Sequence, residues 1–317
     1  MTIRVLEPGL LTTVQDRGRW GCQSFGVPVV GPMDDLSHQL ANLAVGNSAD
    51  CATLEVTLAG PTLEFRGDVR FAVTGAEFEL YLDGVGVPMA TACSARTGSV
   101  LRFGGRGAGA RAYVGVAGGI DVPEVLGSRS TDLASGFGGL GGRPLRVGDR
   151  LALGPVKGWT PPRDAPVEPF PLPDGGARVR AMSSSCTDDD GARCGESALA
   201  GLMTTRFTIG AESNRMGYRL SGPPLVLVDD TPMLSAATPC GTVQMLPSGH
   251  PILLMADRQT TGGYPRGAMV ISADLTLVGQ LAPGDWIRFE QCDRATAVAA
   301  LVAQQQRLIS FSQWRIP

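Results

Sequence analysis

Lysine and histidine are nearly absent from this sequence of 317 residues. Lys157 is the only lysine, and it lies in GPVKGW. A phosphate-binding loop of the Walker type needs a lysine directly after its last glycine, so that mode of ATP binding is excluded. Lys157 is flanked by Val156 and Gly158, which excludes the usual Met-Lys-Met site of biotin attachment. The two histidines, His38 on the polar face of an expected helix and His250 in a PSGHP turn, are not expected to be catalytic.

Charged residues and long apolar runs are also scarce. Charged residues make up 18% of the chain and the net charge is −3, so no basic face is indicated and nucleic acid is not an expected partner. No stretch approaches the roughly 18 apolar residues of a membrane span, and the N-terminus lacks a signal-peptide pattern. Seven scattered cysteines show no zinc-site spacing. We expect a soluble cytoplasmic protein with reduced thiols and no metal.

Glycine and proline are abundant, at 43 and 23 residues. Both interrupt regular structure, so the composition indicates many short strands joined by tight turns and a mainly β fold. The segment from Gly154 to Gly176 holds seven prolines and little apolar periodicity. We therefore predict an N-terminal domain at 1–154, a Pro-rich linker at 155–176 and a C-terminal domain at 177–317.

The halves resemble each other weakly, because LEVTLAGPTLEF and MGYRLSGPPLVL share the pattern L-x-G-P-x-L. This favours two related barrel-like halves with few helices. Helices are expected at Asp34–Val45, with Asp34 as the cap and Gly46 at the end, and at Ala295–Leu308, started by Asp293. Strands are expected at 54–58, 62–65, 70–74, 78–82, 100–103, 111–116, 149–153, 178–182, 205–209, 225–228, 241–245, 252–255, 268–271 and 286–290.

The first candidate site is ADRQTTGGYP, residues 256–265, which follows the apolar strand PILLM. Asp257, Arg258 and Gln259 are predicted as catalytic residues. Asp257 would act as a base or orient the arginine, Arg258 would clamp a carboxylate or carbonyl, and Gln259 would bond an amide. Thr260 would add a substrate contact. The alternative is a solvated hairpin turn with an ordinary ion pair.

The second candidate is SNRMGYRL, residues 213–220. Asn214 and Arg215 are predicted to bind a polar substrate. Tyr218 is grouped with them, although a packing role with its hydroxyl satisfied is the alternative. The whole segment could equally be the start of a structural strand.

Two glycine-rich loops are further candidates. Ser128 and Ser130 lie in residues 117–142, where backbone N–H groups beside glycines are able to form an anion-binding nest for substrate; a flexible loop is the alternative. Residues 14–34 read as a long loop with special backbone angles, which suits a partner interface as well as a substrate site. No serine has the matched histidine and acid of a nucleophile elbow.

Several segments together resemble one family. They are GLLTTVQDRGRWG, FGVPVVGPMD, LEVTLAGPTLEF, AYVGVAGGIDVPEVLGSRSTDL, GGLGGRPLRVGDRL, SNRMGYRL and PILLMADRQTTGGYP, spread over residues 9–290. The chain resembles the biotin-dependent carboxyltransferase-like family. That family comprises the C subunit of 5-oxoprolinase, the allophanate hydrolase subunit 2 or KipI antagonist proteins, and the carboxyltransferase domain of urea carboxylase.

This resemblance implies two tandem cyclophilin-like β-barrel domains. It also implies the C subunit of an ATP-dependent 5-oxoprolinase that cleaves 5-oxoproline to L-glutamate. The implied partners are the KipI-like B subunit and the LamB/YcsF-type A subunit of that enzyme. The isolated chain would then be inactive and bind no cofactor, and ATP would be used by the complex.

Two alternatives stay open. One is a carboxyltransferase acting on urea or a similar amide, with biotin on another protein. The other is a regulatory protein that sequesters a KipI-like partner. The sequence departs from the family's pattern at residues 183–194, which puts a substrate or partner contact there in doubt.

Overall fold

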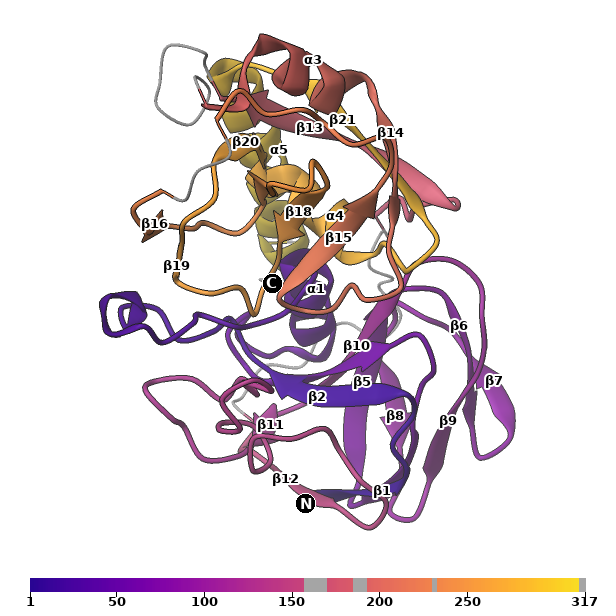
Figure 1. Ribbon diagram of the computed structural model, residues 1–317. Coiled ribbons are helices and arrows are strands. Elements are labelled where there is room, and N and C mark those ends of the chain that lie inside the picture. Colours follow the sequence, from indigo (N-terminus) through magenta and orange to yellow (C-terminus); the bar gives the residue numbers. More distant parts are fainter. Residues whose placement is uncertain (157–169, 185–192, 230–232, 314–317) are drawn as a thin grey trace. The chain divides into compact units, whose positions relative to one another are not determined.

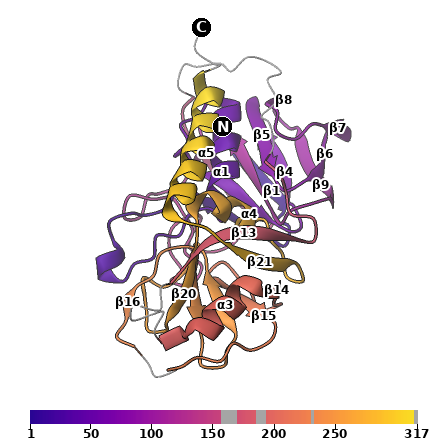
Figure 2. The same ribbon diagram turned by 90° about the horizontal axis from the view of Figure 1, so that it is seen from above.

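The computed structural model describes residues 1–156, 170–184, 193–229 and 233–313 (Figures 1 and 2). Lys157, most of the predicted linker and residues 185–192 of the atypical segment lie outside these ranges. The chain folds into two compact units. Unit 1 comprises residues 1–20, 30–172 and 308–317, and unit 2 comprises residues 21–29 and 173–307.

Unit 1 is built from two antiparallel sheets. The seven-stranded sheet has the order β11-β12-β1-β4-β9-β6-β7, and the five-stranded sheet has the order β2-β3-β10-β5-β8. The strands are β1 (Thr2–Glu7), β2 (Leu11–Gln15), β3 (Thr53–Thr57), β4 (Thr62–Arg66), β5 (Val69–Gly75), β6 (Phe78–Leu82), β7 (Val85–Val87), β8 (Cys93–Ala95), β9 (Val100–Arg106), β10 (Arg111–Val116), β11 (Ile120–Asp121) and β12 (Arg150–Leu153).

The core of unit 1 combines apolar side chains from both sheets. Phe65 of β4 and Phe71 of β5 stack with ring centroids 5.2 Å apart, and Ile3, Leu54 and Val114 are fully buried in the same cluster. Burial of these side chains is the main driving force for joining the sheets.

Helix α1 (Asp35–Val45) covers the other face of the five-stranded sheet, against β10 and β5 (Figure 1). Asp34 caps it by accepting a hydrogen bond from the Ser37 N–H at 3.0 Å, and Gly46 ends it with a φ of 85°. The predicted helix and both of its end signals are confirmed. Because β10 is covered on both faces, all six of its residues are buried.

His38 of α1 does not lie on a polar face, contrary to expectation. It is fully buried, with Nδ1 2.9 Å from Thr53 Oγ1 and Nε2 3.1 Å from the Ala49 carbonyl oxygen. Burial lowers its pKa below 6.5. The helical periodicity missed this because both ring nitrogens find partners beyond the helix.

Unit 2 contains a closed barrel of strand order β13-β20-β17-β18-β15-β14-β21. The first strand, β13, pairs in parallel with the last, β21, in a register that runs from Gly176 opposite Trp286 to Ala181 opposite Gln291. The barrel strands are β13 (Gly176–Ser183), β14 (Arg206–Ile209), β15 (Gly217–Ser221), β17 (Thr242–Met245), β18 (Pro251–Leu254), β20 (Arg266–Val270) and β21 (Trp286–Gln291).

Short elements surround this barrel. Strands β16 (Ala236–Ala237) and β19 (Thr261–Gly262) form a separate two-stranded ribbon. Helix α3 (Glu196–Thr204) packs against β21 and β20, and α4 (Leu275–Gly279) against β13 (Figure 2). The remaining elements are α5 (Arg294–Gln313) and the 3₁₀ turns η1 (Gln23–Phe25) and η2 (Ser272–Asp274).

The mainly β prediction is confirmed, and so is a barrel in the second half; unit 1 forms two sheets. Helix α5 contains the predicted 295–308 helix, and Asp293 Oδ1 accepts from the Thr296 N–H at 2.8 Å.

The strand expected at 225–228 is wrong. Val226 and Val228 are 82% and 76% exposed there, on a loop held by backbone bonds such as Leu225 N–H to the Gly249 carbonyl.

Candidate functional site

Arg215 and Asp257, predicted in two separate motifs, form one buried ion pair in unit 2. Arg215 Nε donates to Asp257 Oδ2 and Nη2 to Oδ1, both at 2.9 Å. Their side chains are only 5% and 4% exposed. The Asp257 N–H also donates to the Arg215 carbonyl at 2.8 Å. This fork-to-fork geometry fixes the turn after β18 to the turn before β15.

The pairing changes the expected role of Asp257. The sequence suggested that this carboxylate acts as a base or orients Arg258, but the structure commits both of its oxygens to Arg215. Arg215 likewise directs its guanidinium to Asp257. The pair therefore holds the two segments together, and its role toward a substrate stays a prediction.

Arg258 folds back onto backbone carbonyls. Its Nε donates to the Thr238 carbonyl at 2.7 Å, and its Nη1 lies 3.4 Å from the Met255 oxygen and 3.5 Å from the Ala256 oxygen. Arg258 thus ties the turn after β18 to the chain that leads from β16 into β17. The side chain is part-buried, so it has an exposed portion for a ligand as well as a structural task.

Gln259 and Thr260 stand at the outer end of this turn, with Gln259 exposed and Thr260 half-buried. Their backbone is fixed by Thr238, whose Oγ1 donates to the Gln259 carbonyl at 2.6 Å and whose N–H donates to the Thr260 carbonyl at 3.1 Å. The turn is therefore rigid, which is the property a binding segment needs.

Asn214 and Tyr218 have internal tasks. Asn214 Oδ1 accepts from the Met216 N–H at 2.8 Å, which closes a tight turn before β15. Tyr218 is 1% exposed, and its hydroxyl donates to the Leu281 carbonyl at 3.2 Å. Tyr218 therefore has the packing role, with its hydroxyl satisfied, that was the alternative to substrate binding. Its burial leaves no surface with which to touch a substrate.

Ser128 and Ser130 are completely buried in unit 1. Their hydroxyls donate to Asp16 Oδ1 at 2.5 and 2.7 Å, and the Arg129 N–H donates to Asp16 Oδ2. The chain's own Asp16 carboxylate therefore occupies the hydroxyls and the one N–H that the sequence assigned to an anionic substrate. These serines consequently anchor the loop to the end of β2 instead of facing a substrate.

Sequence reasoning missed Gln244, which lies next to the predicted site. Gln244 sits on β17 and is 7% exposed, and its Nε2 has no hydrogen-bond partner among the described residues. It lines a small cavity together with Thr238, Gly262 and Tyr264. The sequence pattern that could have identified Gln244 is GTVQM, in which it stands between two apolar residues. Val243 and Met245 are fully buried. Because side chains alternate along a strand, Gln244 must face the opposite side.

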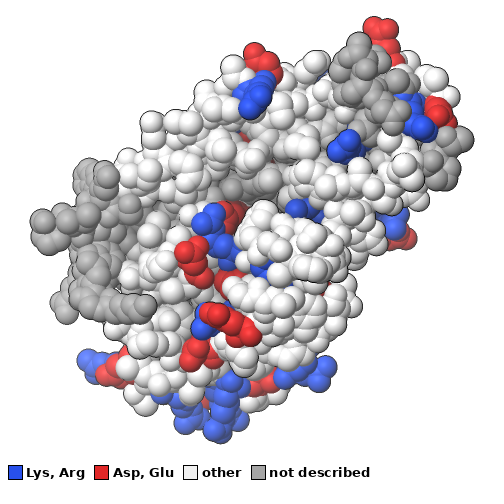
Figure 3. Space-filling model, turned by 90° about the vertical axis from the view of Figure 1, so that its left-hand side faces the viewer, with Lys and Arg blue, Asp and Glu red and all other residues white. Residues whose placement is uncertain are grey.

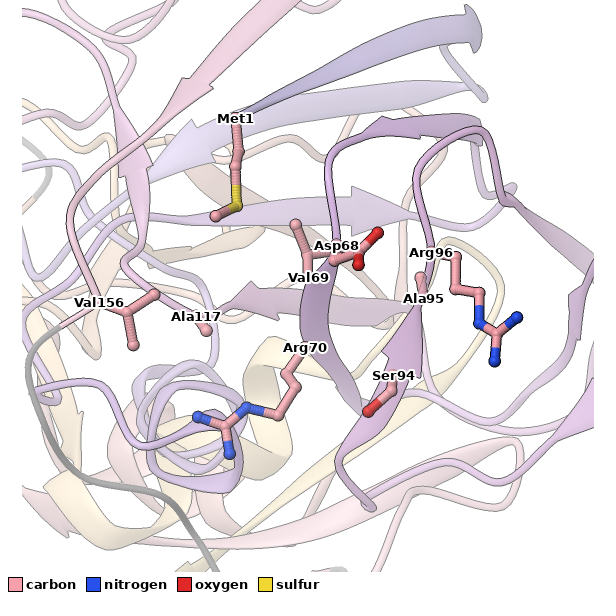
Figure 4. Close-up of a pocket in the computed structure, with 9 residues that line it drawn as sticks. All are labelled: Met1, Asp68, Val69, Arg70, Ser94, Ala95, Arg96, Ala117 and Val156. Carbon is pink, nitrogen blue, oxygen red and sulfur yellow. The ribbon is translucent and has the colours of Figure 1, made fainter.

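A larger hollow of about 270 Å³ lies in unit 1, away from every predicted residue (Figure 4). Arg70, Ser94 and Arg96 line it, with Asp68 beside them. Figure 4 shows the two guanidinium groups extending in opposite directions. The two groups therefore do not converge on one ligand atom.

Charge is spread thinly over the face shown in Figure 3, where acidic and basic side chains are interspersed and large areas are uncharged.

Among the described residues, no group of three or more His, Cys, Asp or Glu side chains could hold a metal ion. The six cysteines within the described ranges are free thiols, and burial raises the pKa of Cys240 beside Arg258. In the same part of the chain, no helix is long and apolar enough to cross a membrane.

These features define a class: a mainly β protein in which a closed barrel follows two antiparallel sheets, with polar residues fixed at the ends of barrel strands. The chain belongs to the family described as carboxyltransferase domain, subdomain A and B, whose model matches residues 25–291.

Relatives of this family are similar along most of the chain. The C subunit of 5-oxoprolinase from Escherichia coli is 40% identical over 316 residues, which cover 99% of this chain and 98% of that protein. The urea amidolyase of Saccharomyces cerevisiae is 33% identical over 90% of this chain, but the match spans only 16% of that protein. The crystal structure of K. lactis urea amidolyase has a TM-score of 0.91 and 31% identity, over 98% of this chain and 20% of that one.

Proposed function

We propose that this chain is the C subunit of an ATP-dependent 5-oxoprolinase, which opens the lactam ring of 5-oxoproline to give L-glutamate. The observation that carries the proposal is the 40% identity to a protein named as the C subunit of 5-oxoprolinase, over nearly the full length of both chains. A second protein of that name, from Haemophilus influenzae, is 38% identical over 91% of this chain.

The barrel unit supplies a site suited to a small amide. The turn of residues 256–260 is fixed by the Arg215–Asp257 pair and by the bonds from Arg258 and Thr238. Opening a lactam builds negative charge on its carbonyl oxygen, so rigid hydrogen-bond donors near that oxygen lower the barrier. Arg258, Gln259 and Thr260 are the donors that this proposal assigns to the substrate.

The relatives are named as one subunit of an enzyme, which implies further subunits. We place the KipI-like B subunit and the LamB/YcsF-type A subunit of 5-oxoprolinase with this chain in the cytoplasm. On this proposal ATP is used by the complex, and the isolated chain binds no cofactor and is inactive.

A second function is favoured by the urea amidolyase relatives, whose structure matches 98% of this chain with a TM-score of 0.91. In that case the chain transfers a carboxyl group from carboxybiotin, carried on another protein, to urea or a similar amide, and biotin is left on the carrier. The lower identity, and the small share of the urea enzyme that the chain spans, place this function second.

One experiment separates the two. The chain is purified with its candidate partner subunits, and release of glutamate from 5-oxoproline is measured with and without ATP. The proposal expects ATP-dependent glutamate only when all subunits are present. No glutamate from the assembled complex, together with carboxylation of urea when a carrier protein bearing carboxybiotin is supplied, would establish the second function instead.

A further inference from the structure

The ribbon of β16 and β19 lies over a buried amide that has no partner in the described part of the chain. Gln244 is on β17, and Nε2 of its side chain makes no hydrogen bond there although the residue is only 7% exposed. A buried donor without an acceptor destabilises a fold, and such groups are uncommon in proteins. An apolar side chain of similar size would avoid this loss, so the amide calls for a functional explanation.

The strand carries a local irregularity at this residue. Val243 pairs with Ala268 of β20, but Gln244 pairs with Arg266, so Gly267 is passed over and the register shifts. Bulges of this kind redirect a side chain and are frequent beside active sites. Here the bulge falls at the residue whose donor is unsatisfied.

The ribbon above Gln244 leaves room for its amide and for little else. A Cβ added to Gly262 of β19 would collide with Gln244 Nε2 and would lie 3.1 Å from Thr238 Cγ2. Glycine at 262 therefore lets the amide of Gln244 keep its present position. The cavity beside them encloses about 20 Å³, which is room for one water molecule or one oxygen atom.

This cavity adjoins the site already described. Thr238 lines it and also fixes the carbonyls of Gln259 and Thr260, while Arg258 holds the Thr238 carbonyl. Tyr264, 44% exposed, forms part of its wall. The cavity and the 256–260 turn therefore share Thr238 as a common wall and anchor.

We propose that Gln244 binds the carbonyl oxygen of the substrate amide, with Nε2 as the hydrogen-bond donor. Rotation about the last side-chain torsion of glutamine is soft, so Nε2 turns toward the cavity without rotamer strain. The donor gains an acceptor when the carbonyl enters. This assignment rests on the proposed function, since the lactam of 5-oxoproline is the amide concerned.

Binding to the full-length chain tests the assignment without requiring turnover. The side-chain NH₂ resonances of Gln244 are identified in ¹⁵N spectra by their loss in Gln244→Glu, and are followed while 5-oxoproline, 2-pyrrolidinone or proline is added. The two lactams should shift them saturably, and proline, which has no amide carbonyl, should not. Resonances that stay unmoved by both lactams, or that move equally with proline, overturn the proposal.

Variants of the reconstituted complex give a second readout. Gln244→Met and Gln244→Glu should each lower kcat/KM for 5-oxoproline at least about tenfold, the effect of losing one donor to a developing oxyanion. Gln305→Glu makes the same chemical change on the exposed face of α5 and should leave kcat/KM unchanged. Gln244 variants that keep the wild-type melting temperature and wild-type kcat/KM overturn the assignment.

The two proposals fail in different ways. A complex that releases no glutamate, combined with lactam-induced shifts of Gln244, refutes the 5-oxoprolinase function and retains an amide-binding glutamine. Full ATP-dependent turnover, combined with Gln244 resonances that neither lactam shifts, refutes only the assignment of Gln244.

Discussion

Arg215 and Asp257 are 42 residues apart in sequence and meet in a pair that is almost completely buried. Their opposite charges compensate each other inside the unit. Removal of one partner from a buried ion pair costs about 3–5 kcal/mol, whereas replacement of both by apolar groups is often nearly neutral.

We therefore expect Asp257→Asn to destabilise the protein by several kcal/mol, and Arg215→Met combined with Asp257→Leu to be more stable than Asp257→Asn. Urea denaturation of Arg215→Met, of Asp257→Leu and of the double variant gives the coupling energy. Strictly additive losses would show that the pair does not act as a unit. The instability also means that activity lost in Asp257→Asn is no evidence for a catalytic base.

Arg258→Lys is the cleaner test of the predicted site. Lysine keeps the positive charge but loses the planar group that reaches the carbonyls of Thr238, Met255 and Ala256. Turnover of 5-oxoproline by the assembled complex should fall at least about tenfold, equivalent to roughly 1.4 kcal/mol of transition-state stabilisation.

Arg219→Lys is the matched control, because the Arg219 side chain makes an exposed ion pair with Glu212 at 3.4 Å. It should retain wild-type turnover and partner binding. Equal turnover in Arg258→Lys and Arg219→Lys, at both low and saturating 5-oxoproline, would move the site away from the 256–260 turn.

His38 gives the stability of the protein a pH dependence whose sign follows from its burial. The pKa in the folded state is lowered below 6.5, so the unfolded state takes up a proton first as the pH falls. His38 should leave the free energy of unfolding unaffected at pH values well above 6.5. As the pH falls from about 6.5, the free energy of unfolding should decline until the pH lies below the folded-state pKa of His38.

Chemical denaturation on either side of pH 6.5, compared between wild type and His38→Gln, measures this effect. Glutamine cannot take up the proton, so its unfolding free energy should show a shallower slope in the acidic range. Identical slopes for wild type and His38→Gln would contradict the account.

At the scale of the elements, β10 and α1 approach each other unusually closely. A Cβ added to Gly115 would lie 2.5 Å from the Ala41 carbonyl oxygen and 3.1 Å from Ala41 Cβ, so the helix would have to move. Gly115→Ala should cost about 1–3 kcal/mol, the range for overpacking a core. Gly105→Ala in β9 is the control, because its Cβ would meet only Glu79 at 3.6 Å. A Gly115→Ala protein with the melting temperature of Gly105→Ala would refute this close packing.

How far the sequence predicts these elements depends on whether their signals are local. Helix α1 carries its cap at Asp34 and its stop at Gly46, so it was predictable. The strand expected at 225–228 failed because its valines are exposed on a loop, which local apolar composition does not reveal.

The candidate site was predictable as segments but not as contacts. The polar turn after PILLM stood out in the sequence, whereas the pairing of Asp257 with Arg215 follows from β18 lying beside β15 in the barrel. Asp16 likewise meets Ser128 and Ser130 across more than a hundred residues, and only the fold shows that this loop binds its own carboxylate. Gln244 required knowledge of the ribbon that covers it.

At the scale of the whole molecule, the proposed function requires partners. We expect this chain to form a stable complex with a KipI-like protein, because its relatives are named as one subunit of several and its long Gly/Pro loops are costly to order without a partner. Co-expression followed by size-exclusion chromatography is the measurement. Elution as two separate peaks at micromolar concentration would speak against the complex.

The parallel pairing of β13 with β21 also has a consequence for the order in which the chain becomes folded during synthesis. Gly176 opens the barrel and its partner Trp286 lies near the end of the chain. Until β21 has emerged from the ribosome, β13 and β14 both present unpaired backbone edges, which invite pairing with other chains. A nascent chain stalled before Trp286 is consequently aggregation-prone. Synthesis of β21, the last strand of the barrel, removes this hazard because β21 pairs with both β13 and β14.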